Sequence, residues 1–191
     1  ANALAQRVTM DAFSWVGVAF ERFRSDWHIA AISRDAAVFN ATQINRVKHA
    51  LTESGDRRAA LAPYVDKLSL SPHPTLATIE GILDAEGSNL SISSYTAWAD
   101  LAEKHLAGSW QTTVLEIPEN DQLLIDVVIK VRNAMAHQSN RSIDELNMVL
   151  PRLRSKHKAL ARPQNRVTPT GIPSYLHGAV PGDRPRPSSI R

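Results

Sequence analysis

The clearest alternation of apolar and polar positions lies in residues 118–137 and predicts an amphipathic helix. Pro118 precedes Asn120 and Asp121, two residue types that cap helices well. At about 100° per residue, one face of this helix would carry Leu124, Val128, Val131 and Met135. Nearly the opposite face would carry Asp126, Lys130, Asn133 and His137. We expect the apolar face to pack in the core, and the polar face either to meet solvent or to line a cleft or subunit interface.

Helical spacing also recurs along the rest of the first 160 residues. The predicted helices are 3–24, 36–53, 57–68, 75–85, 93–107 and 142–160, with 27–32 as an extension of the first or a short turn. Thr75 is expected to cap one of them, and Ser142 with Glu145 matches a capping box after a polar loop at 138–141. The pattern predicts an all-α fold, an up-and-down bundle of about five to seven helices.

Some side chains have a less certain place in this bundle. The first helix repeats Leu4, Val8, Phe13, Val16, Phe20 and Phe23 at helical spacing, and Trp15 and Trp98 are expected in the core. Residues 112–117 alternate weakly and are compatible with an extended segment, but no set of such segments predicts a sheet. Pro151 is expected to kink or restart the last helix.

The composition changes near residue 161. Residues 1–150 hold 13 Lys and Arg against 18 Asp and Glu, whereas 151–191 hold nine against one, and six of the 11 prolines follow residue 161. We therefore expect a helical domain at 1–161 and an extended, Pro-rich basic arm at 162–191, which Tyr175 and Leu176 could anchor. Such an arm either binds nucleic acid or serves as a solubilising or partner-binding extension.

The absence of some residue types and patterns narrows the classes of function. The chain has no cysteine, which excludes disulfides and thiol catalysis. Its seven histidines show no metal-ligand spacing, so neither a metal nor a cofactor is expected. No run of 18 apolar residues predicts a membrane span, and the first residues lack the layout of a secretory signal. We expect a cytoplasmic protein.

Residues 131–138 carry the strongest candidate for chemistry. Arg132, Asn133 and His137 come together where the amphipathic helix should end, and an arginine is rarely buried without a partner. The stretch resembles the signature of the HEPN superfamily, an arginine that is usually followed by a polar residue and is separated from a histidine by four to six intervening residues. More loosely, residues 10–160 are similar to its ribonuclease LS-like branch in helical layout and in the segment DWHIAAISRD.

Two other pairs have a similar spacing, Arg22 with His28 and Arg152 with His157. Both arginines are followed by an apolar residue, so the sequence context selects Arg132 and His137. On a regular helix these two side chains lie about 140° apart, so the arginine must curl or a second chain must complete the site. An alternative is that both residues simply complement the dipole at a helix C-terminus.

RNA cleavage without a metal needs a proton-transfer group and a group that stabilises charge on the phosphate. His137 is expected to act as acid or base, Arg132 as the phosphate clamp and Asn133 as a positioner. Lys130 and Arg141 are expected to bind or position substrate. One histidine per chain is too few for both proton transfers, so a homodimer through the motif helix would supply the second.

The resemblance implies an endoribonuclease that leaves a 2′,3′-cyclic phosphate, often a toxin or an antiviral-defence effector, with a composite cleft between two protomers. One alternative is a HEPN module without catalysis that dimerises and binds RNA or protein. Another is an interaction protein whose basic arm docks an acidic partner, such as a cognate antitoxin.

Overall fold

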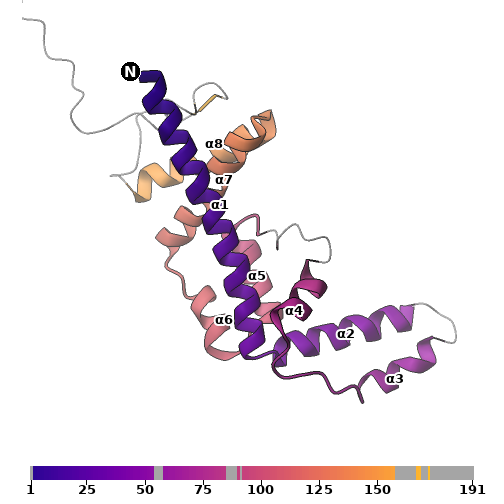
Figure 1. Ribbon diagram of the computed structural model, residues 1–191. Coiled ribbons are helices and arrows are strands. Elements are labelled where there is room, and N and C mark those ends of the chain that lie inside the picture. The colour runs from indigo at the N-terminus through magenta and orange to yellow at the C-terminus, as the bar shows by residue number, and fades with distance from the viewer. Residues whose placement is uncertain are drawn as a thin grey trace, which may run out of the picture. The chain divides into compact units, whose positions relative to one another are not determined.

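The computed structural model describes residues 2–53, 58–84, 90, 92–157, 167–168 and 172, and every element in these residues is a helix. The elements are α1 (Asn2–Arg34), α2 (Ala37–Glu53), the 3₁₀ helix η1 (Ala59–Leu61), α3 (Ala62–Val65), α4 (Leu76–Leu83), α5 (Tyr95–His105), α6 (Gly108–Leu115), α7 (Glu119–His137) and α8 (Asn140–Lys156) (Figure 1). The predicted all-α class is confirmed.

Several helix boundaries agree with the sequence patterns and others do not. Thr75 caps α4 as predicted, with its hydroxyl oxygen accepting a hydrogen bond from the Thr78 backbone N–H at 3.2 Å. The uncertain stretch at 27–32 continues α1 without a break. The extended conformation considered for 112–117 is wrong, because most of this segment belongs to α6, whose backbone turns at Gly108 (φ +53°). Asn120 and Asp121 lie in the first turn of α7 rather than before it.

The chain divides into two compact units, and the division falls within α1. The first unit comprises Ala1–Phe20 and Glu119–Arg191, and the second comprises Glu21–Pro118. The predicted boundary at residue 161 and the anchors Tyr175 and Leu176 lie outside the described residues.

In the first unit, α7 and α8 form a helical hairpin with a two-residue connection. Gln138 adopts a left-handed conformation (φ 47°), and its N–H donates to the Ala134 carbonyl at 3.1 Å, which ends α7. The Ser139 hydroxyl oxygen then accepts from the Ser142 N–H at 3.2 Å and caps α8. The predicted capping box at Ser142 and Glu145 and the four-residue loop are therefore wrong. Because α8 begins at Asn140, Glu145 lies inside the helix and contacts Lys130 and Arg141 instead of capping it.

The core of the first unit joins this hairpin to part of the C-terminal arm. Its buried side chains are Leu123, Val127, Val131, Ala134, Ile143, Leu146, Leu150, Leu153, Val167 and Ile172. The Asn147 side chain fixes the arm through two hydrogen bonds with the Val167 backbone, donating to its carbonyl at 2.9 Å and accepting from its N–H. Pro151 lies inside α8, which continues to Lys156.

The face of α7 that enters this core differs from the predicted one. Val131 is buried as expected, but Leu124, Val128 and Met135 are only half-buried. The buried row is instead Leu123, Val127, Val131 and Ala134. Residues 123–131 are apolar on almost every side of the helix, so the sequence offers two apolar faces with helical spacing. Which face is buried depends on the contacts with α8 and the arm.

The N-terminal half of α1 is also turned differently from the prediction. Most of its large apolar side chains are exposed, namely Leu4, Val8, Trp15, Val16 and Val18. Trp15, expected in the core, is 76% exposed. The buried residue in this half is Gly17, and Phe13 and Phe20 are half-buried. The inner face of the helix is set by close approach at a glycine rather than by the largest apolar side chains.

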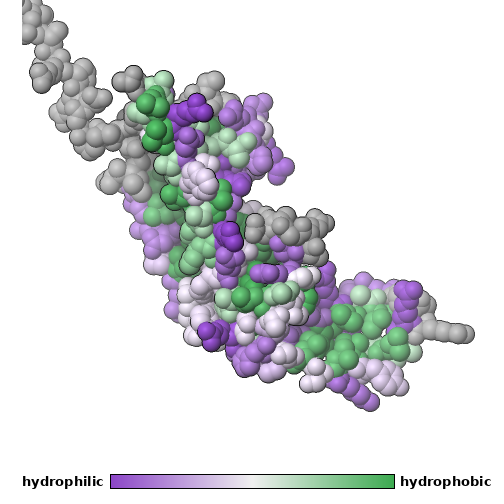
Figure 2. All heavy atoms as spheres, viewed as in Figure 1, coloured by the Kyte–Doolittle hydropathy of each residue, from purple (hydrophilic) through white to green (hydrophobic). Residues whose placement is uncertain are grey.

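In the second unit, α2, α3 and α4 surround a hollow of about 250 Å³ lined mostly by apolar side chains, among them Ile44, Val65 and Ile82. Hydrophobic surface gathers over α2 and α3, which lie side by side (Figures 1 and 2).

The core of the second unit contains an unusual number of polar side chains. Arg24, Ser25 and His28 of α1 and His105 of α5 are all buried. The His28 Nε2 atom lies 3.3 Å from His105 Nδ1, so one ring donates and the other accepts. Trp98, buried as predicted, makes an edge contact with Trp27, and the Arg24 guanidinium lies 6.0 Å from the Trp98 ring.

Burial has the same effect on both histidines. Burial first, and the charge of a protonated His105 second, lower the pKa of His28 from its usual 6.5 to about 4. The pKa of His105 is also lowered, first by burial and then by the positive charge of Lys104. The folded protein therefore keeps both rings neutral at pH values where the unfolded chain takes up protons.

This difference predicts that acid destabilises the protein well above the pH at which most carboxylates titrate. Above pH 6.5 the two histidines do not reduce the free energy of unfolding. As the pH falls from 6.5 to about 4, this free energy decreases, and the loss due to His28 alone is on the order of 3 kcal/mol. Urea unfolding between pH 7.5 and 4.5 measures it. The double variant His28→Gln/His105→Gln should show a clearly flatter pH dependence, and an equally steep one would contradict the assignment.

Candidate functional site

The three motif residues lie in the last turns of α7. Arg132 and Asn133 are half-buried, and His137, the last residue of the helix, is exposed. The Arg132 Nη1 atom donates a hydrogen bond to the Asn133 side-chain oxygen at 3.1 Å. The site therefore combines a held guanidinium with an imidazole that solvent can reach.

The hydrogen bond to Asn133 determines the direction in which the Arg132 side chain turns around α7. Asn133 follows Arg132 by about 100° around the helix, and His137 lies a further 40° in the same sense. Bonding to Asn133 therefore draws the guanidinium around the helix, toward the side that carries His137. The Arg132 side chain therefore turns in the direction that the sequence analysis required, as far as Asn133.

Gly17 of α1 makes room for the stem of Arg132. A Cβ atom at Gly17 would lie only 3.0 Å from Cγ and 3.1 Å from Cβ of Arg132. The arginine stem is thus packed on the backbone of α1, where a larger residue would force the stem or the helix to shift. Sequence analysis missed this residue, because a single glycine inside a helical pattern does not reveal which side chain lies against it.

Lys130 and Arg141, both predicted to contact substrate, meet at a carboxylate. Lys130 Nζ lies 2.9 Å from one oxygen of Glu145, and Arg141 Nε lies 3.1 Å from the other. These contacts lower the pKa of Glu145, with the Lys130 hydrogen bond as the largest cause. The structure brings the two cations together across the α7–α8 hairpin, around Glu145. Arg141 and Glu145 are four residues apart, so the sequence could have predicted their ion pair on one helix face, but not the contact with Lys130.

The other two Arg–His spacings do not form a comparable arrangement. His28 is completely buried, and Arg22 is exposed with Asp26 at 3.6 Å. His157 is half-buried, with Nε2 3.0 Å from the Asn120 carbonyl oxygen. Of the three pairs, the one at Arg132 and His137 has an exposed imidazole next to a held arginine.

Two further findings concern ligands and membranes. Within the described residues, no three or more His, Asp or Glu side chains gather in a way that could hold a metal ion. None of the helices in this part of the chain has the length and apolar character needed to cross a membrane.

Comparisons of the chain with protein-family models, with curated protein sequences and with solved structures find no match.

The close packing at Gly17 predicts a specific sensitivity. Gly17→Val should push α1 away from Arg132 and lower the free energy of unfolding by about 1–3 kcal/mol through overpacking. Ala19→Val on the exposed side of the same helix introduces the same β-branched residue and serves as the control. Chemical unfolding of both variants tests this, and an equal change in the two would show that Gly17 has no special role.

Proposed function

We propose that the protein is a metal-independent endoribonuclease that acts as a homodimer, of the kind found in toxins and antiviral-defence effectors. The observation that carries the proposal is the Arg132–Asn133 hydrogen bond beside the exposed His137. It supports the proposal because it turns a group suited to phosphate binding in the direction around α7 in which His137, a residue suited to proton transfer, follows. This arrangement also agrees with the resemblance of residues 131–138 to the HEPN signature.

The proposed reaction is an internal transesterification. His137 removes the proton from a ribose 2′-hydroxyl, whose oxygen attacks the neighbouring phosphorus atom. The Arg132 guanidinium donates hydrogen bonds to the phosphate oxygens and stabilises the additional charge of the transition state. The bond from phosphorus to the 5′-oxygen breaks, and that oxygen takes a proton from a second histidine. The products are a 2′,3′-cyclic phosphate and a 5′-hydroxyl.

Asn133 is proposed as a positioning residue that acts through Arg132. Lys130 and Arg141 are proposed to guide the RNA backbone toward the site from the edge of the hairpin. Of these two, Arg141 has the freer head group, because its side chain is 90% exposed while it contacts Glu145. Lys130 is 20% exposed and sets the position of Glu145 rather than reaching far into solvent.

The second histidine is proposed to come from His137 of a second copy. In residues 122–135 every side chain of α7 is buried or half-buried, whereas residues 136–141 are all exposed. Contact between copies through the motif helix must therefore include this exposed hairpin tip, residues 136–141. Such a contact would bring two imidazoles toward one phosphodiester.

A non-catalytic binding module is the second candidate function, and the exposed face of α1 favours it. The face carries Leu4, Val8, Trp15, Val16 and Val18 in the first unit. Apolar side chains gathered this densely on a surface often mark a protein-binding site. An interaction protein that holds a partner here would need neither His137 nor the hairpin tip.

The enzymatic proposal predicts RNA cleavage in the presence of EDTA. Arg132→Ala and His137→Ala should each lower the rate by at least about 100-fold, the usual scale for loss of a charge-stabilising or proton-transfer group. Arg152→Ala and His157→Ala remove a pair of similar spacing and serve as matched controls. Cleavage of a labelled RNA and identification of its 3′ ends measure the outcome. Dependence on a metal, or normal cutting by both motif variants, would contradict the proposal.

The dimer proposal predicts a dependence on the hairpin tip. Ala136→Glu places two like charges near each other in the proposed contact and should yield monomers that no longer cut RNA. Trp15→Ser should remain dimeric and active. Sedimentation of the wild type and both variants distinguishes the two surfaces. A monomeric wild type, or dissociation by Trp15→Ser alone, would place the functional contact elsewhere.

A further inference from the structure

The second unit contains another pocket, with polar side chains in its lining. It lies between the end of α1 and the loop that leads into α4. Its volume is about 520 Å³, and it is lined by Ala30, Ser33, Arg34, His73 and Leu76. This volume falls in the range of about 300–1,000 Å³ that is usual for small-molecule sites. No carboxylate is among the lining residues, whereas a guanidinium, an imidazole and a hydroxyl are.

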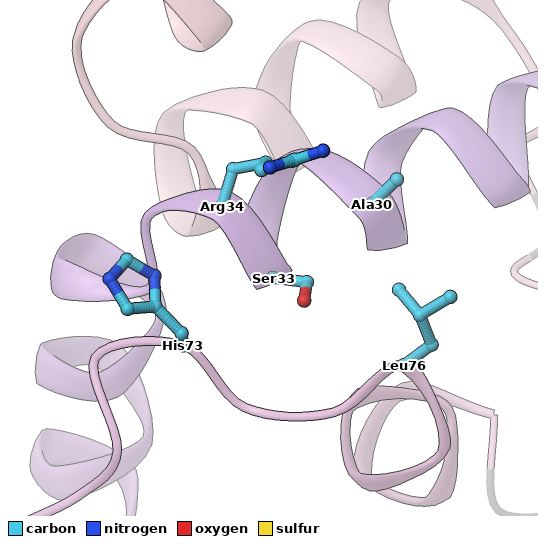
Figure 3. Close-up of a pocket in the computed structure, with 5 residues that line it drawn as sticks. All are labelled: Ala30, Ser33, Arg34, His73 and Leu76. Atoms are coloured by element: carbon cyan, nitrogen blue, oxygen red, sulfur yellow. The ribbon is translucent and has the colours of Figure 1, made fainter.

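The His73 ring and the apolar side chains lie at opposite ends of the lining, and the Arg34 side chain spans the distance between them (Figure 3). The His73 ring lies at one end, Ala30 and Leu76 lie at the other, and the Ser33 hydroxyl lies between them. The Arg34 side chain starts near the His73 end and extends over the pocket toward Ala30. A ligand with an anionic group and an apolar ring would meet complementary side chains at both ends.

The loop that presents His73 is held in place by its backbone. The Ser33 hydroxyl donates to the Pro74 carbonyl at 2.8 Å, and the Ala36 N–H donates to the Pro72 carbonyl at 3.2 Å. The His73 N–H itself donates to the Ser71 hydroxyl oxygen at 3.2 Å. His73 lies between Pro72 and Pro74, and these two prolines restrict the backbone further. The backbone that carries the imidazole therefore loses little conformational freedom when a ligand binds.

The charges around the pocket favour an anion. Asp35, the acidic residue next to Arg34, accepts a hydrogen bond from the Ala37 N–H at 3.0 Å at the start of α2. Arg34 and His73 are both exposed, so their side chains can adjust to an incoming ligand. Leu76, the first residue of α4, is 50% exposed at the apolar end.

We propose that this pocket binds a phosphomonoester joined to a flat apolar ring, as in a nucleoside monophosphate. In this proposal both exposed side chains turn toward one phosphate, which Arg34 holds through its forked donors and His73 contacts from the loop. The base lies against Leu76 and Ala30. The site is separate from the motif on α7 and does not depend on the proposed cleavage activity.

Calorimetric titration of the full chain at low ionic strength with adenosine 5′-monophosphate tests the proposal. The nucleotide should bind, and adenosine should bind at least about tenfold more weakly, because it lacks the charged group. Arg34→Gln and His73→Gln should each weaken binding of the nucleotide by about tenfold or more. Arg46→Gln and His49→Gln change exposed residues of the same types on α2 and should alter the affinity less than about twofold.

Two further measurements separate the parts of the proposal. Leu76→Ser should weaken binding of the nucleotide but leave binding of inorganic phosphate unchanged. Arg132→Ala should bind the nucleotide like the wild type, so failure of the ribonuclease proposal would not affect this result. Equal binding of the nucleotide by Arg34→Gln, His73→Gln and the controls would overturn the inference.

The phosphomonoester could belong to a free nucleotide or to the end of an RNA. A 2′-O-methyl oligonucleotide with a 5′-phosphate, compared with its 5′-hydroxyl form, distinguishes the two sources. A preference for the 5′-phosphate that disappears in Arg34→Gln identifies an RNA end. Binding of the mononucleotide without such a preference identifies a free nucleotide, and binding of neither overturns the proposal.

Discussion

The close approach of α1 and α7 at Gly17 is the constraint on which the candidate site depends. Because a Cβ at Gly17 would meet Arg132 at 3.0 Å, the glycine lets the arginine stem pack directly on a helix backbone. A stem held in this way leaves the guanidinium few directions, and the Asn133 oxygen selects one of them. An exposed arginine on a free helix would lose much more conformational freedom on binding a phosphate. Packing at Gly17 thereby limits the directions in which the Arg132 guanidinium can lie.

Local signals predicted much of this fold, and long-range contacts determined the rest. The bounds of α2, α4 and α7 depend largely on neighbouring residues, so the sequence predicted where these helices lie to within a few residues. The inner faces of α1 and α7 depend on which helices pack against them. Trp15 is exposed because Gly17 occupies the inner side, and Leu124 is half-buried because Leu123 faces α8. The division of α1 between two units leaves no local trace in its sequence.

The candidate site shows the same contrast. The spacing of Arg132, Asn133 and His137 was sufficient to locate a helix end, but the hydrogen bond between the first two requires side-chain geometry that no sequence pattern encodes. The pairing of Lys130 with Glu145 required α8 to start at Asn140, two residues earlier than its strongest capping pattern indicated. The buried histidine pair and the pocket at Arg34 join segments that are 77 and about 40 residues apart, so neither is visible locally.

The central claim is that the Arg132 guanidinium and the His137 imidazole act on one phosphodiester. Nuclear magnetic resonance of the full chain, with an uncleavable 2′-O-methyl dinucleotide as the titrant, tests it most directly. We predict that the Arg132 side-chain N–H and the His137 ring signals shift together with one dissociation constant, and that Asn133→Ala weakens both responses. Shifts of only one residue, or of both with unrelated dissociation constants, would contradict the claim.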